Sequence, residues 1–343
     1  MLKKLSQKFL TLVLALSLFV SCGFINGRIF ARAESAESVE SEVGDTNLAK
    51  YEEVLSDEET YYAEGYKSRD CVLSANVYML RRASIMKGSV VWSEIKNSTL
   101  RKTACTTSTG SSLRYSYTYT KDGLTFKVVH ALLQGSANSK KAQLKKLLEE
   151  HPEGVVVRGK STSGAGHGIL VTQYRDGKFW AVDSAQNSLK ANIGIVPISK
   201  TTVPYISNCS HIWYVDSISG YSVSGFKESK VKGFAIEKSD GKIRFSWSEP
   251  TAVKPDGYYI YKLTTGSEEF KSFLKVDGKS TEACFDESEL MDVEKFMIRA
   301  FKYRGELRVF SSGREIENEI LVSEIEEDGY SNIDWETNPD LYP

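Results

Sequence analysis

The pattern of hydrophobic and polar positions predicts a helix near residue 71 and a series of strands after it. From Cys71 to about Lys87 the apolar residues recur with helical spacing on one face, and Gly88 ends the run. Later alternating or apolar runs predict strands, with one short helix between them. The strand ranges are about 113–129, 155–157, 168–174, 178–183 and 208–216, and the short helix covers 140–150. One helix followed by several strands is typical of an α+β domain, which we assign to residues 61–217.

The pattern changes in the second half of the chain. From residue 232 to 317 short alternating runs are separated by turn residues, which predicts an all-β sandwich. The runs cover 233–238, 242–247, 257–263 and 296–302. The weakly apolar segments between and beside these two regions are interpreted as linkers or tails without a packed core. They are an acidic, disordered linker over 34–60 with a short helix expected around 48–55, a linker over 218–231 and an acidic C-terminal tail over 318–343.

The first 33 residues have the features of a secretory signal peptide. A lysine-bearing start precedes the apolar run Phe9 to Val20, which is short for a membrane span. Ala31-Arg32-Ala33 then offers a cleavage site before Glu34. We therefore expect a secreted protein with no transmembrane segment after signal removal. The alternative is a lipoprotein signal with Cys22 as the lipidated residue, although Phe19 stands where leucine is usual.

Composition narrows the function classes only slightly. The formal net charge of −1 gives no basic excess, so nucleic acid is not expected as a partner. No C-x-x-C pair and no metal-ligand spacing around the histidines occurs, so neither a metal nor another cofactor is expected. Four cysteines remain after the signal. Cys105 and Cys209 are candidates for a disulfide, and Cys284 is expected to be a buried thiol.

Cys71 has the position that a nucleophilic cysteine needs. It follows Asp70, a residue type that caps helix N-termini, so its thiol is expected in the first turn of the helix. The positive end of the helix dipole favours thiolate there and lowers the thiol pKa. The alternative interpretation is a small apolar residue at the start of a helix.

His167 and Asp183 are predicted to lie together on neighbouring strands. If Arg175-Asp176-Gly177 forms a three-residue loop, Ile169 pairs with Asp183. Asp183 is then the diagonal neighbour of His167, with roughly 7–8 Å between their backbones. A two-residue loop would reverse this parity and separate the two side chains. Alone, a histidine entering a strand is usually structural, but with Cys71 the pair completes a nucleophile, a base and a group that orients the base.

These three segments resemble a known family. The run 70–82, DCVLSANVYMLRR, looks like the nucleophile helix of bacterial papain-like cysteine peptidases, and is most similar to proteins related to the bacteriocin-processing endopeptidases. GHGILV at 166–171 and FWAVD at 179–183 resemble the family's histidine and aspartate strands. The resemblance covers residues 61–217. It implies that Cys71, His167 and Asp183 are catalytic.

The sequence departs from this family beside the nucleophile. Members usually carry a glutamine five or six residues before the cysteine, which completes the oxyanion hole. Tyr66 and Gly65 stand there instead, so Ser68 or the Tyr66 hydroxyl is the candidate replacement. Loss of one such donor can lower the rate by about 10²–10³.

The second region resembles a fibronectin type III domain. Trp247 would be its core tryptophan, and Tyr259 and Tyr261 would lie in the next strand. Phe296 stands where a tyrosine is usual. Such modules act as spacers or binding platforms, so a cell-wall or surface partner is expected for it.

The expected function is an exported thiol hydrolase that cleaves peptide or protein substrates through an acyl-enzyme. Two alternatives remain open. One is a secreted interaction protein with an inactive papain-like scaffold, and the other is an amidase or transpeptidase of cell-wall peptides that uses the same residues.

Overall fold

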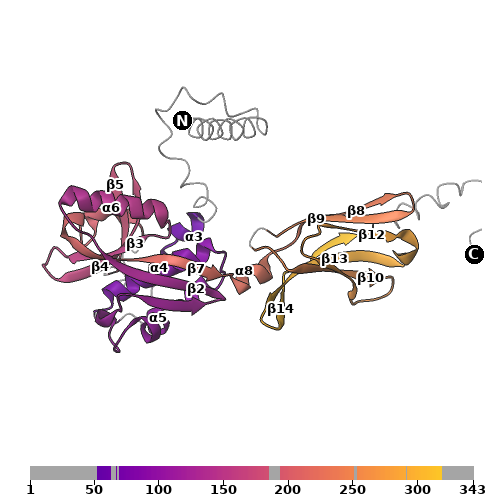
Figure 1. The fold of residues 1–343 in the computed structure, drawn as a ribbon, viewed down its shortest axis with the longest axis horizontal. Helices are drawn as coiled ribbons and strands as arrows, with labels where there is room; N and C mark the ends of the chain where they lie inside the picture. The colour runs from indigo at the N-terminus through magenta and orange to yellow at the C-terminus, as the bar shows by residue number, and fades with distance from the viewer. Residues whose placement is uncertain are drawn as a thin grey trace, which may run out of the picture. The chain divides into compact units, whose positions relative to one another are not determined.

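The computed structural model describes residues 52–62, 67, 69–184, 194–250, 253–290 and 292–318. These residues are mostly in β-strands, with a few helices (Figure 1). The α-helices are α3 (Glu52–Ser56), α4 (Cys71–Met86), α5 (Asn97–Ala104), α6 (Ala137–Glu150) and α8 (Val223–Glu228). Short 3₁₀ helices are η1 (Glu58–Tyr61), η2 (Trp92–Glu94), η3 (Gly110–Ser112), η4 (Ile198–Lys200), η5 (Ile206–Asn208) and η6 (Glu287–Leu290). No helix among these residues is long and apolar enough to cross a membrane.

The first sheet has seven antiparallel strands in the order β1-β2-β7-β3-β4-β5-β6. Its strands are β1 (Tyr117–Lys121), β2 (Leu124–Leu132), β3 (Val155–Lys160), β4 (Gly166–Arg175), β5 (Lys178–Asp183), β6 (Val196–Pro197) and β7 (Cys209–Gly220). The last strand in sequence, β7, inserts between β2 and β3. The five sequence ranges located six of these strands and missed β6, and β7 extends four residues beyond the predicted end.

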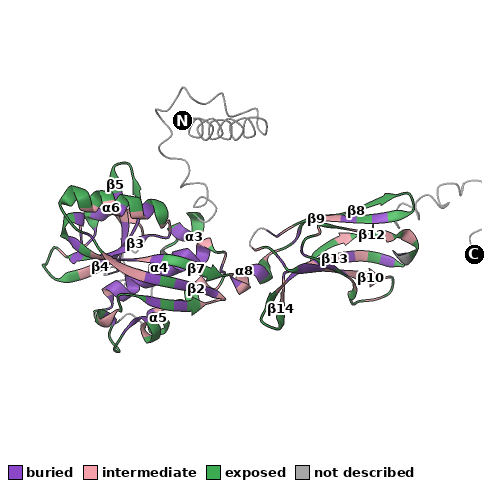
Figure 2. Cartoon of the chain, viewed as in Figure 1, coloured by how far each residue is buried: buried purple, intermediate pink, exposed green. Residues whose placement is uncertain are grey.

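Each face of this sheet is covered by a separate apolar core. Val156 packs in the core that contains α4, whereas Val155 and Val157 pack with Leu144 and Leu148 of α6. Because successive strand residues point to opposite faces, burial on both sides explains why β3 begins with three consecutive valines. Figure 2 shows α6 mostly exposed, since it covers the sheet with one side only.

Helix α4 is buried almost all round rather than on one face as predicted. Fourteen of its sixteen residues are buried, and several of these are polar. Arg81 donates hydrogen bonds to the carbonyls of Ile95, Thr60, Tyr62 and Ser93, at 2.6–3.2 Å. Arg82 bonds to the carbonyls of Glu153 and Pro152 and to the hydroxyl of Tyr61. Buried polar groups are tolerated when they are hydrogen-bonded in this way.

The start of α4 touches β4 at Gly168. A Cβ atom at Gly168 would lie 2.7 Å from Val72 Cγ2 and 2.9 Å from Val72 Cα. Only a glycine therefore allows the helix to approach the strand this closely. The contact sets the distance between the first turn of α4 and the start of β4.

Two further sheets form a β-sandwich around a third core. One sheet runs β11-β10-β13-β14 with β15 also paired to β13, and the other runs β12-β9-β8. Trp247, Phe296 and Phe245 are buried between them. The strands are β8 (Lys232–Ser239), β9 (Lys242–Ser248), β10 (Gly257–Thr264), β11 (Lys271–Asp277), β12 (Glu282–Asp286), β13 (Val293–Arg304), β14 (Leu307–Phe310) and β15 (Arg314–Glu317).

Three segments predicted as linkers or tails contain ordered residues. In the segment 34–60, α3 corresponds to the short helix expected around 48–55 and its Leu55 is buried, while η1 and the buried Thr60 show that the disorder prediction is wrong for residues 57–60. In 218–231, α8 places Phe226 in the sandwich core. Asn318 is buried and donates a hydrogen bond to the Val293 carbonyl at 2.7 Å. In each case a buried residue lies in a segment whose composition is polar.

Replacing Gly168 with alanine tests the helix–strand contact. The added methyl group overlaps Val72, so we expect a loss of about 1–3 kcal/mol in the free energy of unfolding. Chemical denaturation measures this loss. Gly194→Ala is the matched control, because a Cβ there meets no atom within 4 Å. Equal stability of the two variants would contradict the close approach.

Candidate active site

The hairpin of β4 and β5 has the predicted pairing of Ile169 with Asp183, but its turn differs from the predicted one. Arg175 pairs with Lys178, so the loop has two residues rather than three. Asp176 and Gly177 both have positive φ (55° and 73°), which is typical of a type I′ turn. A bulge between Val171 and Gln173 supplies the extra residue, and Ile169 then pairs with Asp183. The predicted loop was therefore wrong, while the predicted partner of Asp183 was right.

His167 and Asp183 are in direct contact. His167 Nε2 donates to Asp183 Oδ1 at 2.7 Å, and Asp183 Oδ2 accepts from the backbone N–H of Thr202 at 2.5 Å. The side chain of Asp183 is fully buried, and that of His167 is 13% exposed. The carboxylate therefore fixes the plane of the imidazole and leaves Nδ1 as the ring nitrogen for another partner.

That partner is Cys71, the first residue of α4. Cys71 lies beside His167 and the backbone N–H groups of Gly168 and Val72, and all three groups favour its thiolate over its thiol. Burial raises the pKa of the Cys71 thiol, but the hydrogen bond and charge of His167, with these two N–H groups, outweigh burial and leave the pKa lowered.

His167 shifts in the opposite direction. Burial lowers the pKa of its imidazole, but the hydrogen bonds and charges of Asp183 and Cys71 raise it to about 9. A lowered thiol pKa beside a raised imidazole pKa favours a thiolate–imidazolium pair near neutral pH. Such a pair combines a nucleophile with a proton donor.

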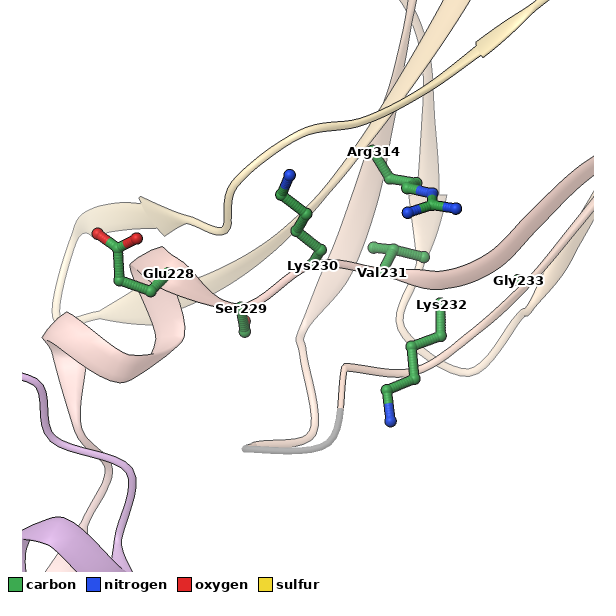
Figure 3. Close-up of a pocket in the computed structure, with 7 residues that line it drawn as sticks. All are labelled: Glu228, Ser229, Lys230, Val231, Lys232, Gly233 and Arg314. Carbon is green, nitrogen blue, oxygen red and sulfur yellow. The ribbon is translucent and has the colours of Figure 1, made fainter. Parts of the chain in front are cut away.

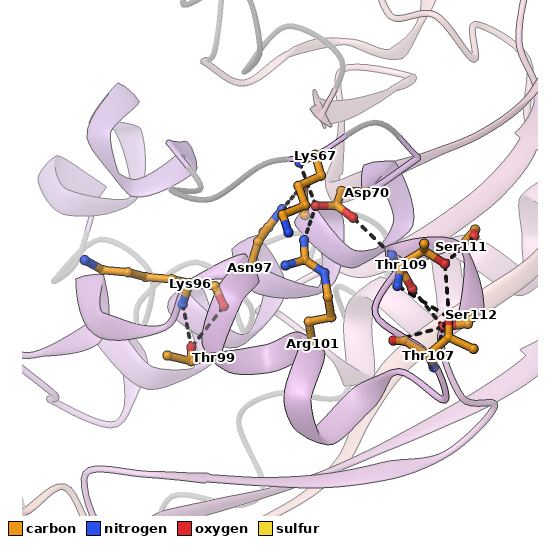
Figure 4. Close-up of polar contacts among 12 residues, drawn as sticks. Lys67, Asp70, Lys96, Asn97, Thr99, Arg101, Thr107, Thr109, Ser111 and Ser112 are labelled. Atoms are coloured by element: carbon orange, nitrogen blue, oxygen red, sulfur yellow. Dashed lines mark hydrogen bonds and ion pairs between the residues drawn. The ribbon is translucent and has the colours of Figure 1, made fainter.

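Asp70 does not cap α4 with its side chain as predicted. No helix N–H donates to its carboxylate, which instead forms a buried ion pair with Arg101 of α5 (Figure 4). The same carboxylate accepts from the backbone N–H groups of Lys67 at 2.8 Å and Gly110 at 3.1 Å. Asp70 thus joins the residues before Cys71 to α5 and η3. The sequence signal was misread because a cap and a buried ion pair both place aspartate before a helix.

The two candidate oxyanion donors, Tyr66 and Ser68, lie outside the described residues. The predicted disulfide is absent, since Cys105 and Cys209 are free thiols in different cores. Cys284 is exposed rather than buried. Within the described ranges, no group of three or more His, Cys, Asp or Glu side chains could hold a metal ion.

A surface hollow of about 440 Å³ lies apart from these groups in the sequence. It is lined by residues 228–233 and Arg314 (Figure 3). Its charged side chains diverge, with Lys232 directed away from Lys230 and Arg314 (Figure 3). Without convergent polar groups this hollow has no arrangement for chemistry, so the Cys71 cluster remains the candidate site.

Two groups in this site had no signal in the sequence. Thr202 contributes only a backbone N–H to Asp183, which any residue except proline could supply. Ser184 donates its hydroxyl to the Gly168 carbonyl at 2.8 Å and so fixes the strand that carries His167. Both contacts depend on tertiary structure rather than on a local pattern.

No protein-family model matches the chain, and no curated protein matches it. Among solved structures, 32% of the chain is similar to the Clostridium perfringens spore cortex lytic enzyme SleM, at 21% identity and a TM-score of 0.23, over only 33% of that protein's length. A second match relates 26% of the chain to 91% of an FN3 domain of human collagen XX, at 11% identity and a TM-score of 0.20. A similar match, at 11% identity, is to 28% of the pectate lyase PelI from Erwinia chrysanthemi, with a TM-score of 0.20. TM-scores this low establish neither fold nor function.

The Asp70–Arg101 pair should be strongly coupled. Because Asp70 is fully buried and the Arg101 side chain is only 10% exposed, Asp70→Asn leaves an uncompensated guanidinium and should cost about 3–5 kcal/mol of unfolding free energy. Arg101→Gln alone should cost a similar amount, and the double variant much less than the sum. Urea denaturation of the four proteins measures the coupling. Glu282→Gln, which breaks the exposed pair with Arg244, is the control and should cost under about 1 kcal/mol. Additive single effects would contradict the buried pair.

Asp183→Asn should lower the pKa of His167, because the amide removes the negative charge that raises it. NMR titration of the His167 ring should give about 9 in the unmodified protein and a clearly lower value in the variant. Asp216→Asn, on the exposed end of β7, should leave the titration unchanged.

Ring titration is a more direct measure here than unfolding. The raised pKa of His167 stabilises the fold fully below pH 6.5, and this contribution is lost as pH rises to about 9. The lowered pKa of Cys71 contributes in the opposite sense, with stability present above pH 9.0 and lost as pH falls through the folded value. The two contributions partly cancel between pH 6.5 and 9.

Proposed function

We propose that the protein is a papain-like thiol hydrolase that cleaves peptide bonds, with Cys71 as nucleophile, His167 as acid and base, and Asp183 as the residue that orients His167. One observation carries the proposal: the imidazole of His167 is hydrogen-bonded to Asp183 at 2.7 Å and lies beside Cys71, whose thiol pKa it lowers. The lowered pKa of Cys71 and the raised pKa of His167 support it, because nucleophilic attack needs the thiolate.

In the first step, the Cys71 thiolate attacks the carbonyl carbon of the scissile bond. The electron pair moves to the carbonyl oxygen, where the backbone N–H of Cys71 is a candidate hydrogen-bond donor. Collapse of this intermediate breaks the C–N bond. His167 donates its proton to the leaving amine, so the products are a thioester on Cys71 and a neutral imidazole.

In the second step, neutral His167 accepts a proton from water, and the hydroxide attacks the thioester carbonyl. The C–S bond breaks, the acid product leaves, and the thiolate–imidazolium pair is restored. Asp183 keeps its charge throughout. Its burial and its second hydrogen bond to Thr202 prevent the imidazole from rotating between the two steps.

The remaining parts of the proposal rest on sequence. The signal-like residues 1–33 support export, with lipid attachment through Cys22 as the alternative. The β-sandwich, with Trp247 and Phe296 in its core, supports a fibronectin type III-like module that binds a surface partner or sets a distance.

Hydrolysis of a pool of internally quenched peptides tests the proposal. Cys71→Ala should lower the rate by at least about 10³-fold, because no other group in the site can form the thioester. Cys284→Ala, which removes an exposed thiol, is the matched control and should leave the rate unchanged.

Iodoacetamide labelling at pH 6, followed by mass spectrometry, tests the thiolate separately. Cys71 should react faster than Cys284, although Cys284 is more exposed. Equal rates would remove the activated nucleophile from the proposal. Fast labelling without cleavage of any peptide would contradict peptidase activity and favour the secreted interaction protein.

A further inference from the structure

A line of paired residues leads away from Cys71 across the first sheet. Gly168 on β4 pairs with Arg158 on β3, Arg158 pairs with His211 on β7, and His211 pairs with Leu132 on β2. Gly168 is the residue that Val72 touches, so this line lies on the sheet face that α4 covers. The Gly168 end of this line lies against the first turn of α4. Further along the line, Arg158 and Leu132 are exposed. Part of this face, at Arg158 and Leu132, is therefore open to solvent.

Aromatic and imidazole rings gather along this line. His130 Nε2 and His211 Nδ1 are hydrogen-bonded at 2.9 Å, and both rings contact the buried ring of Trp213. Tyr115 packs on His130 with 4.5 Å between ring centroids, although 67% of Tyr115 is exposed. The Trp213 indole N–H donates to the carbonyl of Arg114 at 3.1 Å, which holds the backbone beside Tyr115. These rings form a packed cluster, tilted relative to one another, that is partly open to solvent.

The imidazole pair adds no cation to this surface at neutral pH. Burial lowers the pKa of His130, and the charge of His211 lowers it further. Burial and the charge of Arg158 likewise lower the pKa of His211. Two neutral rings that share one hydrogen bond suit an apolar or aromatic partner.

Arg158 supplies the positive charge. It is exposed and forms no ion pair with any described residue, and neither does the exposed Lys160 two positions along β3. Since strands are spaced by about 4.8 Å, Arg158 lies about 5 Å from Gly168 across the sheet and His211 about 10 Å. An extended peptide advances about 3.3 Å per residue, so about three residues next to the scissile bond would cover this line.

We propose that Arg158, His211, His130 and Tyr115 form a substrate subsite for a peptide segment that carries a carboxylate and an aromatic side chain within about three residues of the scissile bond. The carboxylate pairs with Arg158, and the aromatic side chain stacks on the rings of Tyr115 and His130. This inference rests on the proposed function, because it takes the thiol of Cys71 as the point where the peptide is cut.

Binding to the Cys71→Ala protein tests the subsite without requiring cleavage. The probes are fluorescein-labelled pentapeptides with a fixed Phe and with Glu, Gln or Lys at one flanking position at a time. Fluorescence anisotropy should show that at least one Glu peptide binds about tenfold more tightly than its Lys counterpart. Arg158→Glu should abolish or reverse this preference, and Tyr115→Ala should weaken binding of both peptides.

A control variant separates local from overall charge. Lys178→Glu, at the turn end of β5, changes the net charge by the same amount and should keep the preference for Glu. Circular dichroism of each variant checks that it is folded, and Arg158→Gln provides a milder change that should reduce the preference without reversing it.

The outcomes distinguish the two proposals. Equal binding of Glu and Lys peptides, or an unchanged preference in Arg158→Glu, would overturn the subsite even if the unmodified protein cleaves peptides. Selective binding that depends on Arg158, without any cleavage by the unmodified protein, would support the subsite and contradict the hydrolase.

Discussion

The close packing of α4 on β4 is the constraint on which the rest of the site depends. Val72 lies against Gly168, and the neighbouring residues in each element are Cys71 and His167. A side chain at residue 168 would separate the thiol from the imidazole, because the helix would have to move outward. The same contact brings the Gly168 N–H to the sulfur. One small residue thus serves both the packing of the core and the electrostatics of the thiol.

Burial of α4 has a second consequence, which is that its polar residues must find partners in the interior. Arg81 and Arg82 meet this demand by binding backbone carbonyls of segments distant in sequence. Asp70 does so by pairing with Arg101. Hydrogen bonds to charged groups are among the stronger ones in proteins, and removing one partner leaves a buried charge. Breaking these interactions would cost much of the free energy of unfolding, so the helix that carries Cys71 is firmly fixed. A functional site needs its residues fixed in this way.

Local patterns predicted much of the fold because they reflect burial. The helical period beginning at Cys71, the apolar run at 155–157 and the alternating strands after residue 232 all correspond to observed elements. Features that depend on distant partners could not be predicted. The bulge at Thr172, the ion pair of Asp70 and the separation of Cys105 from Cys209 are set by packing between elements. The pairing of Ile169 with Asp183 followed from counting one extra residue in the hairpin, and the sequence does not determine where that residue lies.

The two acidic groups of the site, the carboxylate of Asp183 and the thiol of Cys71, differ in burial. Asp183 is fully buried with hydrogen bonds to both oxygens, whereas Cys71 is partly exposed. A buried, satisfied carboxylate holds its charge in a region of low dielectric, where its effect on His167 is large. The thiolate needs less protection because His167 and two backbone N–H groups already stabilise it. The line of Arg158 and His211 begins at Gly168, the residue whose backbone N–H helps to stabilise the sulfur.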